Sequence, residues 1–163
     1  MTPIENAGDL RWADITTEPI VVALPSRHPL SRRRRIRRED LATIPLVYFP
    51  RHQSAGYYDR CLSQVYGSAT IPNIVRTEPS EERILVVVAE GTGISLLLEE
   101  RAATLRYPGV IYRRFTDPEP TGALGVAFGP DPSLAARRFV ELAQRLAHQP
   151  KTATRPRLGS HAS

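Results

Sequence analysis

Residues 17–51, TEPIVVALPSRHPLSRRRRIRREDLATIPLVYFPR, carry the clearest structural pattern in this chain of 163 residues. Residues 19–24 form a short apolar, β-branched run that a proline closes, which is typical of a buried strand. Residues 46–49, LVYF, form a second such run between two prolines. The stretch therefore predicts a strand, an arginine-rich crossing loop, a short helix at residues 39–42 and another strand, as if the chain left one sheet and entered a second.

Several short sequence motifs occur along the chain in a characteristic order and spacing. In the opening stretch these are EPIVVALP, the turn HPL and the helix start DLA. Further along they are YFPR at 48–51, GYYD at 56–59, PNIV at 72–75, VAEGTGISLL at 88–97 and GVIYR at 109–113. Together they resemble the effector-binding domain of LysR-type transcriptional regulators, from about residue 10 to residue 147. They are similar to the aromatic-degradation branch of the family, which senses muconate-like or benzoate-like acids.

The resemblance implies an α/β domain of the type 2 periplasmic-binding-protein-like kind, with a ligand in the cleft between two lobes. One lobe would be complete here, accompanied by two hinge strands and a C-terminal helix of the other lobe. The expected ranges are 1–14 for an N-terminal segment without a clear pattern, 15–148 for the domain, 26–122 for the second lobe, 20–24 and 123–128 for the hinge strands, 131–147 for the helix and 149–163 for a disordered tail.

Hydrophobic periodicity supports an α/β fold without any reference to relatives. Helices are predicted at 54–69, 80–90 and 99–106, and strands at 71–76, 93–98, 110–115 and 123–128. Strands separated by helices of this length imply a parallel or mixed sheet covered on both sides. In the last helix, Asp131 is the predicted N-cap with Pro132 at the first helical position. Its candidate core contacts are Leu134, Val140, Leu142 and Leu146.

The positive net charge is concentrated in two places. Six of the 22 basic residues are arginines in the run at residues 32–38, and three more lie in the tail at 151–157. Without these nine positive charges, the net charge of +5 becomes −4 for the rest of the chain. We interpret the run as a solvated loop, since such runs are usually exposed; the alternative is phosphate contact without sequence readout.

The composition favours a single globular domain in the cytoplasm. The hydrophobic share of 41% suits a globular protein, and 163 residues suffice for one domain with a substantial core. No apolar run approaches the roughly 20 residues needed to span a bilayer. The first residues, MTPIENAGDLRW, lack the regions of a signal peptide.

Catalytic and metal-binding patterns are missing, so we expect no enzyme, no metal site and no cofactor. The four histidines have no metal-ligand spacing, and no P-loop, nucleophile elbow or complete dinucleotide fingerprint occurs. Cys61 is the single cysteine, which excludes an internal disulfide. It falls on the apolar stripe of the helix at 54–69, so we predict that it is a buried core residue rather than a nucleophile.

The best candidate for a ligand site follows the strand at 46–49. Open α/β sheets bind ligands at the carboxyl ends of their strands, where helix N-termini and loop amides converge. The loop offers a cation, a hydroxyl and free amides, which suits an organic carboxylate. The alternatives are that Arg51 is only a surface charge and Ser54 only an N-cap, and that Gly91 is a helix C-cap rather than part of the site. The candidate ligand residues are Phe49, Pro50, Arg51, His52, Ser54, Thr92 and Gly93.

Two functions stay open at this level. The first is an effector-sensing domain for a small aromatic or dicarboxylic acid, which acts by hinge closure in a homo-oligomeric regulator. The second is a ligand-free interaction or oligomerisation fragment of such a regulator. Family members begin with a winged helix-turn-helix, and nothing before residue 10 matches it or the opening elements of the first lobe. We therefore expect DNA contact only through a helix-turn-helix outside this chain.

Overall fold

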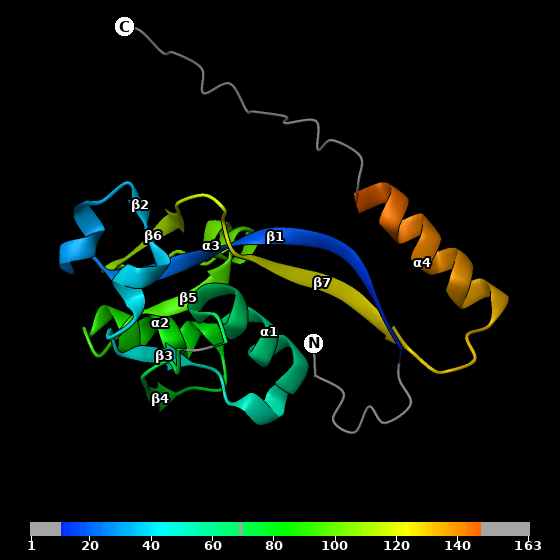
Figure 1. The fold of residues 1–163 in the computed structure, drawn as a ribbon, viewed down its shortest axis with the longest axis horizontal. Helices are drawn as coiled ribbons and strands as arrows, with labels where there is room; N and C mark the ends of the chain where they lie inside the picture. Colours follow the sequence, from blue (N-terminus) through cyan, green and yellow to red (C-terminus); the bar gives the residue numbers. More distant parts are fainter. Residues whose placement is uncertain (1–10, 69, 148–163) are drawn as a thin grey trace, which may run out of the picture.

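The computed structural model describes residues 11–68 and 70–147 as a lobe of mixed α/β structure, a two-stranded ribbon and a C-terminal helix (Figure 1). The strands are β1 (Arg11–Pro25), β2 (Arg35–Ile36), β3 (Leu46–Tyr48), β4 (Ile74–Thr77), β5 (Ser95–Leu98), β6 (Val110–Phe115) and β7 (Thr121–Phe128). The helices are α1 (Ala55–Tyr66), α2 (Glu81–Ala89), α3 (Glu99–Thr104) and α4 (Leu134–Ala147). Short 3-10 turns are η1 (Pro29–Arg32), η2 (Arg38–Leu41) and η3 (Arg51–Gln53).

Strand β1 organises the whole arrangement because its two halves have different neighbours. Its second half lies between β5 and β6, antiparallel to both, with Val22 opposite Leu96 on one side and Arg113 on the other. Its first half pairs antiparallel with β7, and the register shifts between Asp14 and Thr16. The predicted strand at 20–24 is thus the second half of a 15-residue strand. Residues 20–24 lie in the sheet of the lobe, while the partner of β7 is the first half of β1.

The sheet is mixed, as the spacing of the elements predicts. In the five-stranded sheet, β2 runs parallel to β6, and in a separate two-stranded sheet β3 runs parallel to β4. A parallel bridge between Leu46 and Ile94 places β3 beside the segment that leads into β5. Two hydrogen bonds fix this contact, from Val47 N–H to the Ile94 carbonyl (2.8 Å) and from Ile94 N–H to the Pro45 carbonyl (2.9 Å).

Helices cover both faces of the sheet, which confirms that part of the sequence prediction. Alternate residues of a strand point to opposite faces. Ile20, Val22 and Leu24 pack in one core cluster with the apolar stripe of α1. Val21 and Ala23 pack in another with residues of α2 and α3. Cys61 belongs to the first cluster and is buried with a free thiol, so the prediction of a core cysteine is confirmed.

Two predicted element starts differ from the observed ones for local reasons. The predicted strand at 71–76 begins only at Ile74, since Ile71 is exposed and Pro72 has no N–H to donate to a ladder. The last helix begins at Leu134 rather than near Asp131. Ser133 acts as its cap, since its hydroxyl accepts from the Ala136 N–H at 3.2 Å.

The apolar side chains of α4 are exposed in this structure. No residue of α4 is buried, and Val140 is only half-buried. The prediction that Leu134, Leu142 and Leu146 make core contacts is therefore wrong for the described chain. The reason is spatial, because α4 lies at the end of the β1–β7 ribbon, away from the lobe (Figure 1). Its exposed large apolar residues are Leu134, Phe139, Leu142 and Leu146.

Further expectations concern the two ends of the chain, membrane-spanning helices and metal sites. The predicted tail at 149–163 and residues 1–10 of the predicted N-terminal segment lie outside the described residues. Among the residues that are described, no helix has the length and apolar character needed to cross a bilayer. The same residues contain no group of three or more metal-ligating side chains.

Candidate functional site

The candidate loop at residues 49–54 lies where β3 ends and two helices begin. It forms turn η3, with hydrogen bonds from Gln53 N–H to the Pro50 carbonyl (3.0 Å) and from Ser54 N–H to the Arg51 carbonyl (3.2 Å). The Gln53 amide also donates to the Pro79 carbonyl at 3.2 Å, just before α2. The loop is therefore fixed between the start of α1 and the start of α2.

An aromatic cluster anchors the beginning of the loop. The Phe49 ring lies 4.5 Å from the Tyr48 ring, stacks with Tyr57 at 5.9 Å and meets Tyr58 edge-on at 5.5 Å, measured between ring centroids. Such pairs add stabilisation beyond the area they bury. Burial raises the pKa of Tyr57 and of the neighbouring Cys61 thiol, so both groups are neutral at pH 7. The base of the loop is thus rigid and uncharged.

Arg51 is held against α1 by a bidentate ion pair. Its Nε donates to Asp59 Oδ1 at 2.9 Å and its Nη2 donates to Asp59 Oδ2 at 2.6 Å. The hydrogen bond from Arg51 lowers the pKa of Asp59, and the same contact raises the pKa of Arg51. The side chain is 61% exposed, and Nη1 is not used by Asp59. The guanidinium therefore has a defined orientation and an open edge.

Ser54 occupies the N-cap position of α1 without acting through its hydroxyl. Its carbonyl accepts the first helical hydrogen bond, from Tyr58 N–H at 2.9 Å, but its side chain makes no capping bond. Ser80 at the start of α2 differs, because its hydroxyl accepts from Arg83 N–H at 3.4 Å. Capping by the side chain therefore does not explain Ser54. The hydroxyl and the N–H groups of the first helical turn remain beside Arg51 and the exposed His52.

Thr92 and Gly93 are not brought to this loop. The bridge between Leu46 and Ile94 places them beside the start of β3, whereas the loop follows its end, about 10 Å further along the strand. Their turn is also occupied by the end of α2. Gly91 has φ +89° and its N–H donates to the Val88 carbonyl, and Thr92 N–H donates to the Val87 carbonyl. The alternative that this glycine ends a helix is confirmed.

The arginine run is largely exposed, as interpreted from the sequence, but most of its side chains also have partners. Arg33 and Arg37 both pair with Asp40, at 2.7 and 3.5 Å. Arg38 donates to the Pro118 carbonyl at 2.8 Å. Within the described chain, only Arg32 and Arg34 of the run lack a hydrogen bond or ion pair.

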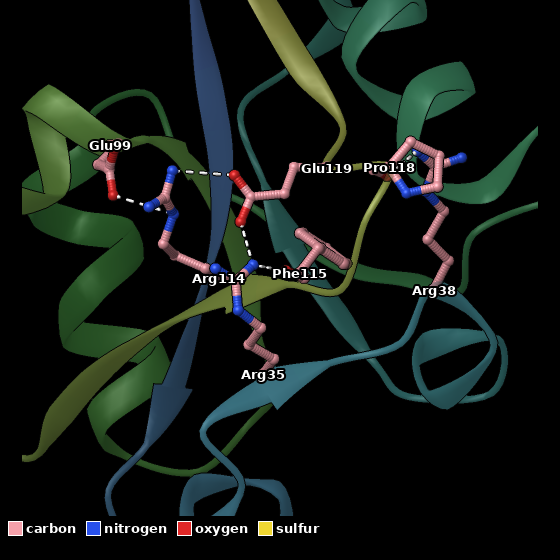
Figure 2. Close-up of polar contacts among 7 residues, drawn as sticks. All are labelled: Arg35, Arg38, Glu99, Arg114, Phe115, Pro118 and Glu119. Carbon is pink, nitrogen blue, oxygen red and sulfur yellow. Dashed lines mark hydrogen bonds and ion pairs between the residues drawn. The ribbon is translucent and has the colours of Figure 1, made fainter.

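Glu119 is the acidic centre of this region, and the sequence analysis missed it. Its carboxylate pairs with Arg35 and with Arg114 (2.9 Å), and Arg114 reaches Glu99 at 3.3 Å (Figure 2). Arg35 also donates to the Phe115 carbonyl at 2.6 Å. These contacts join the arginine run to the β6–β7 loop. The contacts of Arg35 connect residues about 80 positions apart in sequence, so no local pattern could have revealed them.

A family model described as the LysR substrate binding domain matches residues 1–147 of the chain. Among curated proteins, the HTH-type transcriptional regulator TtuA of Agrobacterium vitis is 32% identical over 98 residues. That match covers 60% of this chain and 32% of TtuA, so the chain spans about a third of this relative.

Two solved structures show the same fold. The effector binding domain of QuiR in complex with shikimate gives a TM-score of 0.66 at 19% identity, over 90% of this chain and 69% of that one. Full-length CbnR, a LysR family regulator solved with its target DNA, gives a TM-score of 0.69 at 15% identity. This match covers 90% of the present chain and 50% of CbnR.

Proposed function

This chain belongs to the family of LysR substrate-binding domains, and from that membership we propose that it senses a small organic acid. Its mixed α/β fold is that of LysR effector-binding domains, which is periplasmic-binding-protein-like. The family consists of transcriptional regulators rather than enzymes, in agreement with the absence of catalytic motifs noted in the sequence. The proposed ligand is an aromatic or dicarboxylic acid.

The observation that carries the proposal is the combination of Arg51 and Ser54 at the end of β3. The Arg51 guanidinium is oriented by Asp59, and Ser54, three residues later, has a hydroxyl that makes no capping hydrogen bond. The loop directly precedes the first-turn amides of a 12-residue helix, and the helix dipole adds positive potential at that end. A carboxylate can accept from all three kinds of donor.

Asp59 defines how such a carboxylate would approach. Since Asp59 takes Nε and Nη2 of Arg51, the acid would bind the Nη1 edge and turn its second oxygen toward Ser54. The aromatic cluster under Phe49 keeps this edge in place and offers apolar contact to a ring. The proposed site therefore comprises Phe49, Pro50, Arg51, His52 and Ser54. Thr92 and Gly93 do not belong to it, because they lie beside the other end of β3.

The relatives support the class of ligand. QuiR was solved with shikimate, a carboxylate, bound to an effector domain of the same fold. CbnR was solved with its target DNA. We infer that the present lobe, at residues 26–122, is one of two lobes, and that the ribbon of β1 and β7 forms the crossing between them. Closure of the lobes on the acid would then reorient DNA-binding parts in a homo-oligomeric regulator.

Thermal unfolding with a panel of acids tests the proposal. Benzoate, shikimate and succinate are suitable probes, and an acid at 100 times its Kd should add about 2.7 kcal/mol to the unfolding free energy. We expect Arg51→Ala to reduce the acid-induced shift in Tm, since it removes the oriented cation of this site. Arg32→Ala, which removes an exposed arginine without a described partner, should keep the full shift.

Two serine variants separate ligand binding from helix capping. Ser54→Ala should weaken the acid-induced shift with little change in stability, because its hydroxyl does not cap α1. Ser80→Ala should do the opposite and cost about 1 kcal/mol, because its hydroxyl caps α2. No shift with any acid, or an equal shift in Arg51→Ala, would contradict the proposed site.

The exposed face of α4 favours a second candidate function. Four large apolar side chains there are solvent-exposed, which suits a ligand-free interaction or oligomerisation fragment of a regulator. Size-exclusion runs at several protein concentrations distinguish the two candidates when combined with the acid panel. Concentration-dependent oligomers without any acid response would favour the second function.

A further inference from the structure

We propose that the groove between α3 and β6 is a second ligand site, which takes a small aromatic monocarboxylate with Arg106 as its cationic contact. The groove is open to solvent along its length and has a volume of about 670 Å³, within the roughly 300–1,000 Å³ typical of small-molecule sites. It lies on the face of the sheet that carries α3, and α3 and β6 form its two walls. The groove lies along β6, and both β1 and β5 lie between β6 and the Leu46–Ile94 bridge to β3, so it is roughly three strand spacings, about 14 Å, from β3. It is therefore separate from the loop that contains Arg51.

The cation at one end of the groove is unpaired. Within the part of the chain that the structure describes, the Arg106 side chain makes no hydrogen bond or ion pair, and it is exposed. The other arginines on the walls and next to them are already engaged. Arg101 pairs with Glu81 at 2.6 Å, and Arg113 donates to backbone carbonyls of Ser31 and Arg33. Arg106 thus supplies positive charge that is free to attract an anion.

The floor of the groove is apolar. Val21 and Ala102 are buried at its base, and Val110 and Tyr112 face it from alternate positions of β6. The Tyr112 hydroxyl donates to the Leu105 carbonyl, so its polar atom is satisfied and its ring remains as a surface. Burial raises the pKa of Tyr112, and the charge of Arg106 opposes this rise, which agrees with a guanidinium close to the ring.

The opposite end of the groove selects for a single negative charge. Arg114 closes that end, but its charge is shared by Glu99 at 3.3 Å and Glu119 at 2.9 Å (Figure 2). A second carboxylate on the ligand would meet these two acidic side chains and be repelled. An aromatic monocarboxylate instead places its ring over Tyr112 and its charge on Arg106. Benzoate has this chemistry.

The experiment is a benzoate titration of the 163-residue chain, followed by amide chemical shifts in NMR. We expect saturable shifts at residues of β6 and α3. Arg106→Gln should weaken the binding at least tenfold, Arg106→Lys should retain part of it, and Arg138→Gln, which removes an exposed charge on α4, should leave it unchanged. Succinate should bind this groove at least tenfold more weakly than benzoate.

Several results would overturn the proposal, and each differs from failure of the proposed effector site. Shifts confined to residues 49–58 would leave the Arg51 site standing and remove the groove. Equal weakening by Arg106→Gln and Arg138→Gln would show non-specific charge attraction only. Shifts of β6 that depend on protein concentration without benzoate would identify the groove as a contact between copies of the chain. Loss of the loop shifts in Arg51→Ala, with the groove shifts retained, would support two separate sites.

Discussion

The two halves of strand β1 have similar backbones and very different surroundings. Residues 20–24 have strand neighbours on both edges and helices over both faces, and their side chains are at most 3% exposed. The first half pairs with β7 alone, and its described side chains from Ala13 onward are half-buried or exposed up to Pro19. Strand β7 is also largely apolar in sequence, yet Leu124 is 44% exposed. The burial of a strand therefore depends on the number of layers around it as well as on its composition.

Removing one leucine side chain from each region is the strongest test of this comparison. Leu24 is fully buried in the lobe, so Leu24→Ala should lower the unfolding free energy by about 2–5 kcal/mol through lost burial and a cavity. Leu124→Ala makes the same chemical change in the ribbon and should cost about 1 kcal/mol or less. Urea unfolding of both variants gives the two values. Equal losses would mean that the ribbon is as well packed as the lobe.

A pair of glycine substitutions tests packing from the opposite direction. A Cβ added at Gly93 would lie 2.4 Å from the Pro45 carbonyl oxygen, which β3 cannot easily move. We expect Gly93→Ala to cost about 1–3 kcal/mol by overpacking. Gly129, just after β7, has nothing within 4 Å of the same position, so Gly129→Ala should be neutral or stabilising by up to about 1 kcal/mol. A stable Gly93→Ala variant would show that the β3–β5 contact is loose.

The smallest expected difference concerns acid sensitivity. Hydrogen bonds from Arg83 and Arg76 lower the pKa of Glu78 at the end of β4. A lowered pKa stabilises the fold above the usual glutamate range, and this stabilisation is lost as the pH falls through and below that range. Glu78→Gln should flatten the decline of unfolding free energy over that range. Glu141→Gln, a control on the exposed helix α4, should leave the slope as it is in the parent chain.

Most elements of the lobe could be predicted from the sequence, because local signals decide them. Ser80 followed by two glutamates identifies the start of α2, and Gly91 with its positive φ marks the end. The apolar stripe around Cys61 identifies the buried face of α1 in the same way. Strand β5 stands out because three consecutive leucines follow Ser95, and all four residues are buried.

The ribbon and its surroundings could not be predicted in this way. Residues 11–19 mix charged, polar and apolar side chains, and they form a strand because β7 pairs with them across more than 100 positions. The exposure of α4 depends on which elements surround the helix. Its strongly amphipathic pattern predicts a buried face but does not show whether another element covers that face. In the sequence, Glu119 is a single acidic residue in a proline-rich turn. Only the fold shows that Arg35 and Arg114 pair with it.

The candidate site was likewise only partly predictable from the sequence. The loop at 49–54 could be placed at a strand end from prolines and the adjacent helix start, and the structure puts it there. The ion pair of Arg51 with Asp59 spans eight residues and depends on how the turn meets the helix, so it went unforeseen. Thr92 and Gly93 were assigned to the same place because a sequence shows where strands are, but not which of their ends lie together.

The continuity of β1 has a mechanical consequence. The strand has no joint between its ribbon half and its core half, apart from the shifted register between Asp14 and Thr16. A torque applied near Arg11 would pass through covalent bonds into residues clamped by β5 and β6. A rotation of the first half of β1 would therefore be passed directly to the lobe. The shifted register is the position at which the strand can bend.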